Sequence, residues 1–263
     1  MSETLTILSQ VVGWIYFFAW SISFYPQFWV NYKLGNIKGY SLDFGFMNLS
    51  GFLAYFLYSL WGYLSPSVIP GVVDIQDIAF AGHAFLLTFC LLIQCYVYDP
   101  EFFKKIKIWV KIYLAIAWAI SLIICPLELF HKVPHAGNNF NGCLWLGYLK
   151  VSITLMKYFP QAFKNYRNQS TEGWSIANVL LDFTGGSFSI LQIFIDGANT
   201  GDWNVFGKGG SFNVAKFCLG FTSIVFDIVF MIQHYVLYKP KKIRNKNLDL
   251  SLTENINKHG VEF

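Results

Sequence analysis

Charged side chains are scarce in this sequence. Only 13% of the 263 residues are Asp, Glu, Lys or Arg, whereas 55% are hydrophobic. An ordinary soluble domain carries about 25% charged residues. The shortage excludes a soluble globular domain and favours a membrane protein.

The sequence also lacks a cysteine pattern typical of metal sites. Its five cysteines lie in or at the ends of apolar segments, so we interpret them as small apolar residues. Cys125 and Cys143 fall on the same predicted side of the membrane and could pair. We expect neither a bound metal nor a cofactor.

The basic segment of a cleaved signal peptide is missing as well. Residues 1–4 carry the acid Glu3, and the apolar run behind them is longer than the apolar region of such a peptide. We therefore expect the first apolar run to remain in the mature protein.

Seven apolar runs are long enough to cross a bilayer, which takes about 20 residues. They occupy roughly residues 10–31, 44–64, 77–98, 108–126, 143–163, 176–195 and 212–237. The predicted fold is an all-α membrane protein with seven transmembrane helices.

Basic residues predict how the spans are oriented, because Lys and Arg collect on the cytoplasmic side of membrane proteins. Fourteen follow spans one, three, five and seven: Lys33, Lys38, Lys104, Lys105, Lys107, Lys111, Lys164, Arg167, Lys239, Lys241, Lys242, Arg244, Lys246 and Lys258. Only Lys132, Lys208 and Lys216 fall on the opposite side. We predict a luminal amino terminus and a cytosolic carboxyl terminus, and the positive net charge requires no nucleic-acid partner.

The chain contains an internal repeat. A shift of 134 residues, from Pro26 to Pro160, superposes three short motifs: Pro26-Gln27 on Pro160-Gln161, Asn31-Tyr32-Lys33 on Asn165-Tyr166-Arg167, and Gly39-Tyr40-Ser41 on Gly173-Trp174-Ser175. Spans one to three and five to seven then form two parallel three-helix repeats, and span four connects them. The predicted units are the first repeat at 1–98, the connector helix at 99–135, the second repeat at 136–238 and a cytosolic tail at 239–263.

Each repeat places a Pro-Gln pair inside an apolar span. Proline removes one backbone hydrogen bond and clashes with the carbonyl four residues earlier, so we expect a kink at Pro26 and at Pro160. In lipid such a break is tolerated where other helices or a water-lined cavity satisfy the freed carbonyl. We therefore predict a cavity shared by the two repeats.

Several charged residues fall within or at the ends of the spans, and those we single out are Asp77, Lys150, Lys157, Asp182 and Asp227. A charge at the centre of a membrane helix costs about 2.5–3.5 kcal/mol, so these residues are functional candidates. The plainer interpretation is one ion pair between Asp182 and Lys157, which would leave the other three charges unexplained. Asp43 lies near a predicted cytosolic span end, where we expect it to be in water.

An intramembrane acid can couple transport to protons. If its surroundings alternate between water, an ammonium group and apolar side chains, it can bind a proton in one compartment and release it in another. The charges therefore favour a proton-coupled carrier rather than an enzyme.

The Pro-Gln motifs within seven spans resemble the PQ-loop family, and longer runs are similar to its lysosomal cystine transporters. Those runs are residues 19–27, 157–161, 170–176, 178–189 and 224–230. The resemblance implies a SWEET-like arrangement of three, one and three helices. It also implies proton-coupled export of L-cystine from a lysosome or vacuole-like compartment by alternating access.

The resemblance further implies roles for individual residues. Proton coupling is expected at Asp182, Asp77 and Asp227; substrate binding at Lys157, Asn178, Asn48, Trp20, Phe24 and Lys150; and gating at Pro26, Gln27, Pro160 and Gln161. Cystine carries two carboxylates and two ammonium groups, which lysines, an acid and amides would complement.

Two alternatives remain open. The first is a PQ-loop carrier for another amino acid or a sugar, and the second is a seven-helix cargo or signalling receptor. The expected partners are L-cystine, protons and membrane lipid, without nucleic acid, and the expected location is a lysosomal or endolysosomal membrane. The sequence predicts no particular protein partner.

Overall fold

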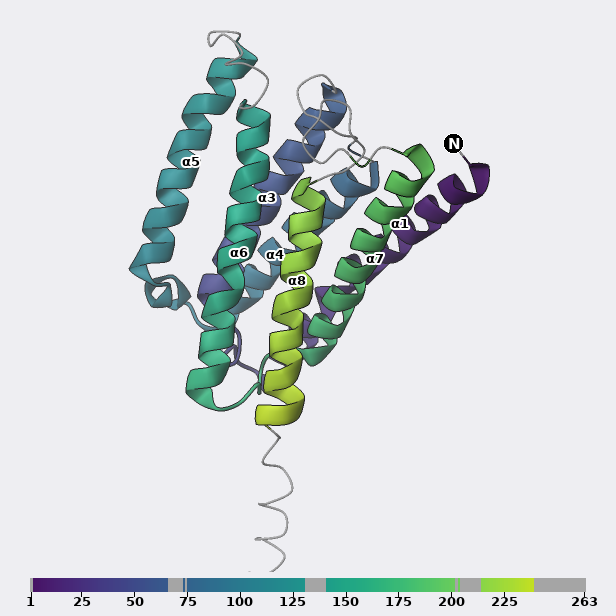
Figure 1. Ribbon diagram of the computed structural model, residues 1–263. Helices are drawn as coiled ribbons and strands as arrows, with labels where there is room; N and C mark the ends of the chain where they lie inside the picture. Colours follow the sequence, from purple (N-terminus) through teal and green to yellow (C-terminus); the bar gives the residue numbers. More distant parts are fainter. Residues whose placement is uncertain are drawn as a thin grey trace, which may run out of the picture.

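The computed structural model describes residues 2–65, 73, 75–130, 141–201, 203 and 214–238. Helices dominate these residues (Figure 1). They are α1 (Glu3–Ser23), α2 (Tyr25–Leu34), α3 (Leu42–Leu64), α4 (Ile75–Tyr98), η1 (Phe102–Lys105), α5 (Ile108–Leu129), α6 (Gly142–Asn168), α7 (Ile176–Thr200), α8 (Val214–Ile232) and the π-turn η3 (Gln233–Leu237). The predicted tail at 239–263 and the basic residues Lys132 and Lys208 lie outside the described residues.

Among the described residues, five helical segments are long and apolar enough to cross a membrane: Glu3–Leu34, Ile75–Tyr98, Ile108–Leu129, Ile176–Thr200 and Lys216–Leu237. The chain is a multi-pass membrane protein. Helices α3 and α6, predicted as spans two and five, fall outside this set. They pack against each other and carry the buried polar residues Asn48, Lys150 and Lys157. These side chains contribute to their lower hydropathy.

Helix packing follows the internal repeat. Helix α1 packs against α7, and α3, the counterpart of α7, packs against α6, the counterpart of α1. The contacts of α3 with α4 and of α1 with α4 likewise match those of α7 with α8 and of α6 with α8. Helix α5 packs mainly against α6 and α3 and stands at one side of the bundle (Figure 1).

The two prolines differ in their effect on the helix. Around Pro26 the helical hydrogen bonding is interrupted at one residue, Phe24, because α1 ends at Ser23 and α2 begins at Tyr25. Phe24 itself keeps helical backbone angles (φ −72°, ψ −34°), so the two segments follow directly on each other. At Pro160, by contrast, α6 continues without interruption from Gly142 to Asn168.

The structure bears on three further expectations, which concern Asp43, Lys216 and the pairing of Cys125 with Cys143. Asp43 is only 7% exposed and accepts a hydrogen bond from the Lys107 backbone N–H (2.9 Å), so the prediction that it lies in water is wrong. Lys216, which we counted among the basic residues of the luminal side, is buried within α8. Cys125 and Cys143 are both free thiols.

Candidate substrate cavity between the repeats

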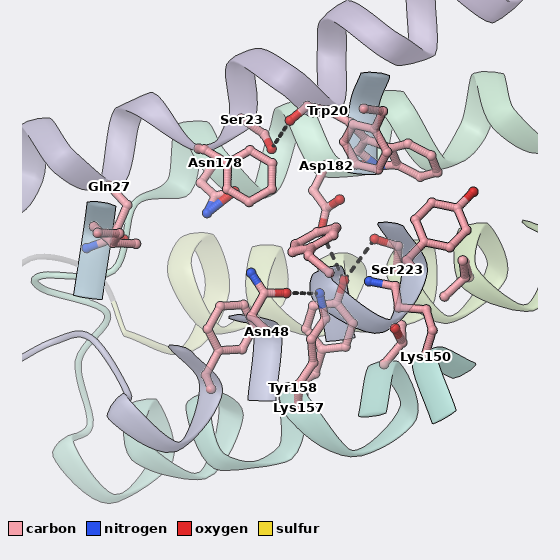
Figure 2. Close-up of a pocket in the computed structure, with 18 of the residues that line it drawn as sticks. Trp20, Ser23, Gln27, Asn48, Lys150, Lys157, Tyr158, Asn178, Asp182 and Ser223 are labelled. Carbon is pink, nitrogen blue, oxygen red and sulfur yellow. Dashed lines mark hydrogen bonds between the residues drawn. The ribbon is translucent and has the colours of Figure 1, made fainter. Parts of the chain in front are cut away.

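An internal cavity lies between the two repeats (Figure 2). Its walls come from α1, α2, α3 and α4 of the first repeat and from α6, α7 and α8 of the second. The lining residues are Trp20, Ser23, Phe24, Gln27, Tyr40, Phe44, Asn48, Phe52, Tyr55, Phe80, Leu91, Lys150, Thr154, Lys157, Tyr158, Asn178, Asp182, Lys216, Leu219 and Ser223. Side chains from both repeats therefore face one space.

Two lysines on α6 point into this cavity. Their spacing of seven residues places them on one helical face, with Thr154 between them, and all three are buried. The Lys157 ammonium donates a hydrogen bond to Asn48 Oδ1 on α3 (2.8 Å), as Figure 2 shows. The Lys150 ammonium lies 3.8 Å from the centroid of the Phe52 ring, a cation–π contact.

Neither lysine is neutralised by a carboxylate at contact distance. Within the part of the chain that the structure describes, no ion pair within 4.0 Å involves Lys150 or Lys157. The plainer interpretation, an ion pair between Asp182 and Lys157, does not match this geometry. The ammonium groups remain available to an anionic ligand.

Asp182 belongs to a hydrogen-bonded group at the second repeat. Tyr158 donates its hydroxyl to Asp182 Oδ2 (3.1 Å), and the same hydroxyl lies 3.0 Å from Ser223 Oγ. A tyrosine hydroxyl has one proton, so Ser223 must be the donor to Tyr158 when Tyr158 donates to Asp182. Asp227, one turn along α8 from Ser223, is 1% exposed, and its Oδ2 has no hydrogen-bond partner.

Aromatic side chains form much of the remaining wall. The Trp20 indole stacks on Phe80 (5.2 Å between centroids) and donates Nε1–H to the Asp182 carbonyl oxygen (3.1 Å). A Cβ on Gly185 would lie only 2.3 Å from the indole, so this glycine makes room for Trp20 against α7. Phe24 contacts Phe52 edge to face at 5.4 Å.

A second buried charge cluster adjoins the cavity. Asp77 on α4 accepts hydrogen bonds from Tyr16 (3.2 Å) and Tyr55 (3.4 Å). The Lys216 ammonium lies 4.0 Å from Asp77 Oδ1 and donates to Tyr16 Oη (3.2 Å) and Gln192 Oε1 (2.8 Å). These contacts join helices of the first repeat to α7 and α8 of the second.

The two Pro-Gln glutamines make matching hydrogen bonds to the opposite repeat. Gln27 Nε2 donates to the Gly173 carbonyl (2.9 Å), and its Oε1 accepts from the Ser175 N–H (3.0 Å). Gln161 repeats the pattern in the other direction, with the Gly39 carbonyl at 3.0 Å and the Ser41 N–H at 2.7 Å. We call these four hydrogen bonds the amide clasp.

The clasp has a supporting layer that is also duplicated. Gln27 donates to Asn31 and Asn31 to Gln94, while Gln161 donates to Asn165 and Asn165 to Gln233. Gln94 in turn donates a hydrogen bond to the Phe28 carbonyl, and Gln233 donates one to the Ala162 carbonyl. Phe28 and Ala162 are repeat counterparts. The residue order of the duplication is thus preserved in the hydrogen bonds.

Glycines bring the two clasp loops into backbone contact. A Cβ on Gly39 would lie 2.1 Å from the Glu172 carbonyl oxygen, closer than any real Cβ contact. Gly173 has φ +82°, a conformation that side chains rarely adopt, and faces Gly39 from the other loop. The glycines are therefore required for the approach of the two repeats.

The free volume of the cavity is about 70 Å³. Pockets for small molecules usually measure about 300–1,000 Å³, and a water molecule occupies roughly 30 Å³ in the liquid. The cavity therefore has room for only a few waters. An amino-acid ligand could enter only if the helices around it moved apart.

The structure brings most of the predicted site residues together. Trp20, Phe24, Gln27, Asn48, Lys150, Lys157, Asn178 and Asp182 line the cavity, whereas Asp77, Asp227, Pro26, Pro160 and Gln161 do not. The sequence argument missed Tyr158, Lys216 and Ser223. For two of them a signal existed, because Ser223 precedes Asp227 by one helical turn and Tyr158 directly follows Lys157.

The comparisons with known proteins agree with this architecture. A family model described as the PQ loop repeat matches residues 8–68 and 143–202. The chain is 42% identical to cystinosin of Bos taurus over 252 residues, which are 91% of this chain and 66% of that protein. It therefore spans about two thirds of the bovine protein's length.

Two relatives are covered more fully. A cystinosin homolog of Dictyostelium discoideum is 40% identical over 261 residues, which are 94% of this chain and 87% of that protein. A cystine transporter of Saccharomyces cerevisiae is 25% identical over 252 residues, 87% of this chain and 94% of that protein.

Proposed function

The chain belongs to the PQ-loop repeat family and, within it, to the cystinosins, and from this premise we propose that it carries L-cystine together with protons out of an acidic compartment into the cytosol. The names of its relatives support cystine as the substrate, because they include a cystine transporter as well as cystinosins. Proton coupling and the direction of transport are our own inference from the site.

The observation that carries the proposal is a pair of buried lysines without ion-pair partners in a cavity shared by both repeats. Cystine has two carboxylates, and Lys150 and Lys157 provide two ammonium groups on one face of α6. Asp182 and the oxygens of Asn48 and Asn178 would accept hydrogen bonds from its ammonium groups. A sugar has no charge for these groups, so the cavity favours an amino-acid ligand over a sugar.

Aromatic rings would contact the middle of the substrate. Phe24 and Phe52 lie on the cavity wall between the polar groups, and Trp20 adds the face of its indole. A disulfide is polarisable and apolar, and sulfur makes favourable contacts with aromatic rings. The proposed pose places the two charged ends of cystine on polar groups and the disulfide on the rings.

Proton coupling is assigned to Asp182, Asp227 and Asp77. Asp182 lines the cavity and would exchange a proton with the Tyr158 hydroxyl and Ser223. Asp227 lies one helical turn after Ser223 on α8. Its Oδ2 has no hydrogen-bond partner among the described residues and is available to carry a proton. Asp77 stands near the predicted luminal end, where protons would enter.

Alternating access requires the repeats to move against each other, because the cavity is too small for cystine as it stands. We assign the hinge to Pro26 and Pro160 and the gate to the amide clasp formed by Gln27 and Gln161. The interruption of helical hydrogen bonding next to Pro26 gives the first repeat a place to bend. The 3+1+3 arrangement, with α5 as connector, would then move as two repeats of three helices.

The proposed location is a lysosomal or endolysosomal membrane, with the amino terminus in the lumen and the carboxyl terminus in the cytosol. The asymmetry of Lys and Arg between the two sides of the spans supports this orientation.

The test uses the protein redirected to the cell surface, where its luminal side faces the medium. Export from the lumen then becomes uptake of labelled cystine from the medium, with an inward current. Lowering the external pH should increase both, because more protons are available on the loading side. Absence of pH-dependent cystine uptake in a well-expressed protein would contradict the proposal. Excess unlabelled glucose should leave uptake unchanged, whereas competition by glucose would favour the sugar carrier.

One variant addresses the proton site. Asp182→Asn keeps the shape of the side chain and its ability to accept from Tyr158, but it cannot release a proton. We expect the pH-driven current to fall at least about 100-fold, the equivalent of roughly 2.7 kcal/mol. Thr184→Val, a change on the same helix at a partly exposed position outside the cavity lining, serves as the matched control. An unchanged current in Asp182→Asn would remove this residue from the mechanism.

A further inference from the structure

A second cleft lies at the end of the bundle that carries the amide clasp, outside the substrate cavity. It has a volume of about 370 Å³ and is formed by the loop before α3, the segment between α4 and α5, and the last turns of α6. We propose that this cleft binds a multiply charged phosphate anion, such as the phosphorylated inositol ring of a membrane lipid. We call it the basic cleft.

The charge of the cleft supports an anionic ligand. Five cations line it, namely Lys38, Lys105, Lys107, Lys164 and Arg167, against the two carboxylates Asp43 and Asp99. Three positive charges therefore remain in excess. The volume falls within the range of about 300–1,000 Å³ that is usual for small-molecule sites.

The carboxylates are already engaged. Asp99 pairs with Lys105, and Asp43 lies 3.8 Å from the Lys107 ammonium. The Lys164 ammonium donates to the Tyr40 carbonyl oxygen (2.6 Å), which fixes it at the wall of the cleft. Of the residues that the structure describes, none forms an ion pair within 4.0 Å with Lys38 or Arg167. Lys164 is in no such ion pair either, so Lys38, Lys164 and Arg167 are the cations left for a ligand.

The internal repeat provides a comparison within the same chain. At the positions that correspond to Lys38 and Lys164, the other repeat has Glu172 and Val30. The backbone and the clasp hydrogen bonds nevertheless match between the repeats. The fold therefore does not require a cation at either of these two positions, so the charge of the cleft is not a by-product of the duplication.

The position of the cleft suits a lipid headgroup. It lies at the helix ends that the distribution of Lys and Arg assigns to the cytosol, and Phe163, half of whose surface is exposed, extends from it along α6. Basic pockets between helices on the cytoplasmic side are sites at which phosphorylated lipid headgroups bind. Three phosphate contacts can come from Lys38, Lys164 and Arg167.

Binding can be measured on the full chain purified in detergent. The probes are a short-chain phosphatidylinositol bisphosphate, soluble inositol trisphosphate and short-chain phosphatidylserine, all at about 150 mM salt, where surface charges are screened beyond roughly 8 Å. We expect the first two to bind and phosphatidylserine to bind at least tenfold more weakly. Binding of inositol trisphosphate without the lipid would identify a soluble phosphate compound as the source of the anion.

Two variants test the location of the site. Lys38→Glu combined with Arg167→Gln should lower the affinity at least tenfold, and Lys38→Gln alone should lower it by a smaller factor without adding a negative charge. Both side chains are exposed, so these changes leave no buried partner unsatisfied. Lys33→Gln is the matched control, because Lys33 is the repeat counterpart of Arg167 and lies outside the cleft.

Some outcomes would overturn the proposal. These are equal binding of phosphatidylserine, equal loss of affinity in Lys33→Gln, or no binding by a wild-type sample that unfolds cooperatively. The measurement contains no cystine, so its failure would leave the proposed transport function standing, and the failure of cystine uptake would leave this site standing.

Discussion

The two ends of the helical bundle hold the repeats together in different ways. At the end predicted to face the cytosol, the amide clasp joins them through neutral side chains and backbone groups, with each hydrogen bond present twice. At the opposite end a single charged cluster, built on Asp77 and Lys216, connects them. The first contact follows the symmetry of the repeat, and the second does not.

The difference has a consequence for the response to protons. Amides and backbone groups do not titrate between pH 4 and 8, so acidity alone cannot open the clasp. The Asp77–Lys216 contact, in contrast, joins two charged groups, and it lies at the end through which cystine would enter.

The largest effect is expected from breaking the charged cluster. Lys216→Met leaves the Asp77 carboxylate buried beside two tyrosine hydroxyls, and removal of one partner from a buried pair costs about 3–5 kcal/mol. We expect the free energy of unfolding to fall by about 3 kcal/mol at neutral pH, as measured by unfolding in detergent.

The double variant tests whether the two charges act together. Asp77→Asn combined with Lys216→Met removes both charges, so its loss should be smaller than the sum of the two single losses by about 1 kcal/mol or more. Strict additivity would mean that Asp77 and Lys216 are not coupled, and the contrast between the two ends would then rest on the clasp alone.

Breaking either half of the amide clasp should cost less stability than breaking the charged cluster, and the two halves should cost the same. Gln27→Leu and Gln161→Leu each leave a buried backbone N–H and a buried carbonyl without a partner, which costs about 2 kcal/mol. The two losses of unfolding free energy should agree within about 0.5 kcal/mol and should not vary between pH 5 and pH 7. Gln169→Leu, a glutamine exposed at the end of α6, serves as the control. Losses that differ by more than 1.5 kcal/mol would show that the clasp is not symmetric in energy.

Much of this arrangement can be predicted from the sequence, because repeated motifs and apolar length are local features. The shift that superposes Pro26 on Pro160 also pairs Gly39 with Gly173, and these glycines prove to meet in space. Helical periodicity places Lys150 and Lys157 on one face, and both are buried at the cavity.

Other features depend on contacts between distant segments. We counted Lys216 among the basic residues of the luminal side, but its ammonium donates hydrogen bonds to Tyr16 and Gln192 inside the bundle. Asp43 looked exposed because it stands at a helix start, yet the segment before α5 covers it and donates the Lys107 N–H. We predicted a kink at both prolines, and the helical hydrogen bonding is interrupted next to Pro26, at Phe24, whereas α6 is continuous through Pro160.

The smallest effect concerns the cavity itself, where the repeats differ in chemistry. Lys157 occupies the position that corresponds to Ser23, so Lys157→Ser makes the second repeat resemble the first. The change removes the hydrogen bond to Asn48 and one of two ammonium groups available to a substrate carboxylate. We expect cystine uptake to fall about tenfold, equivalent to roughly 1.4 kcal/mol, through a higher KM. Ser23→Ala, which removes only a bond to the Trp20 carbonyl, should change uptake less than threefold. If both variants lose uptake equally, the cavity does not depend on the charge that distinguishes the repeats.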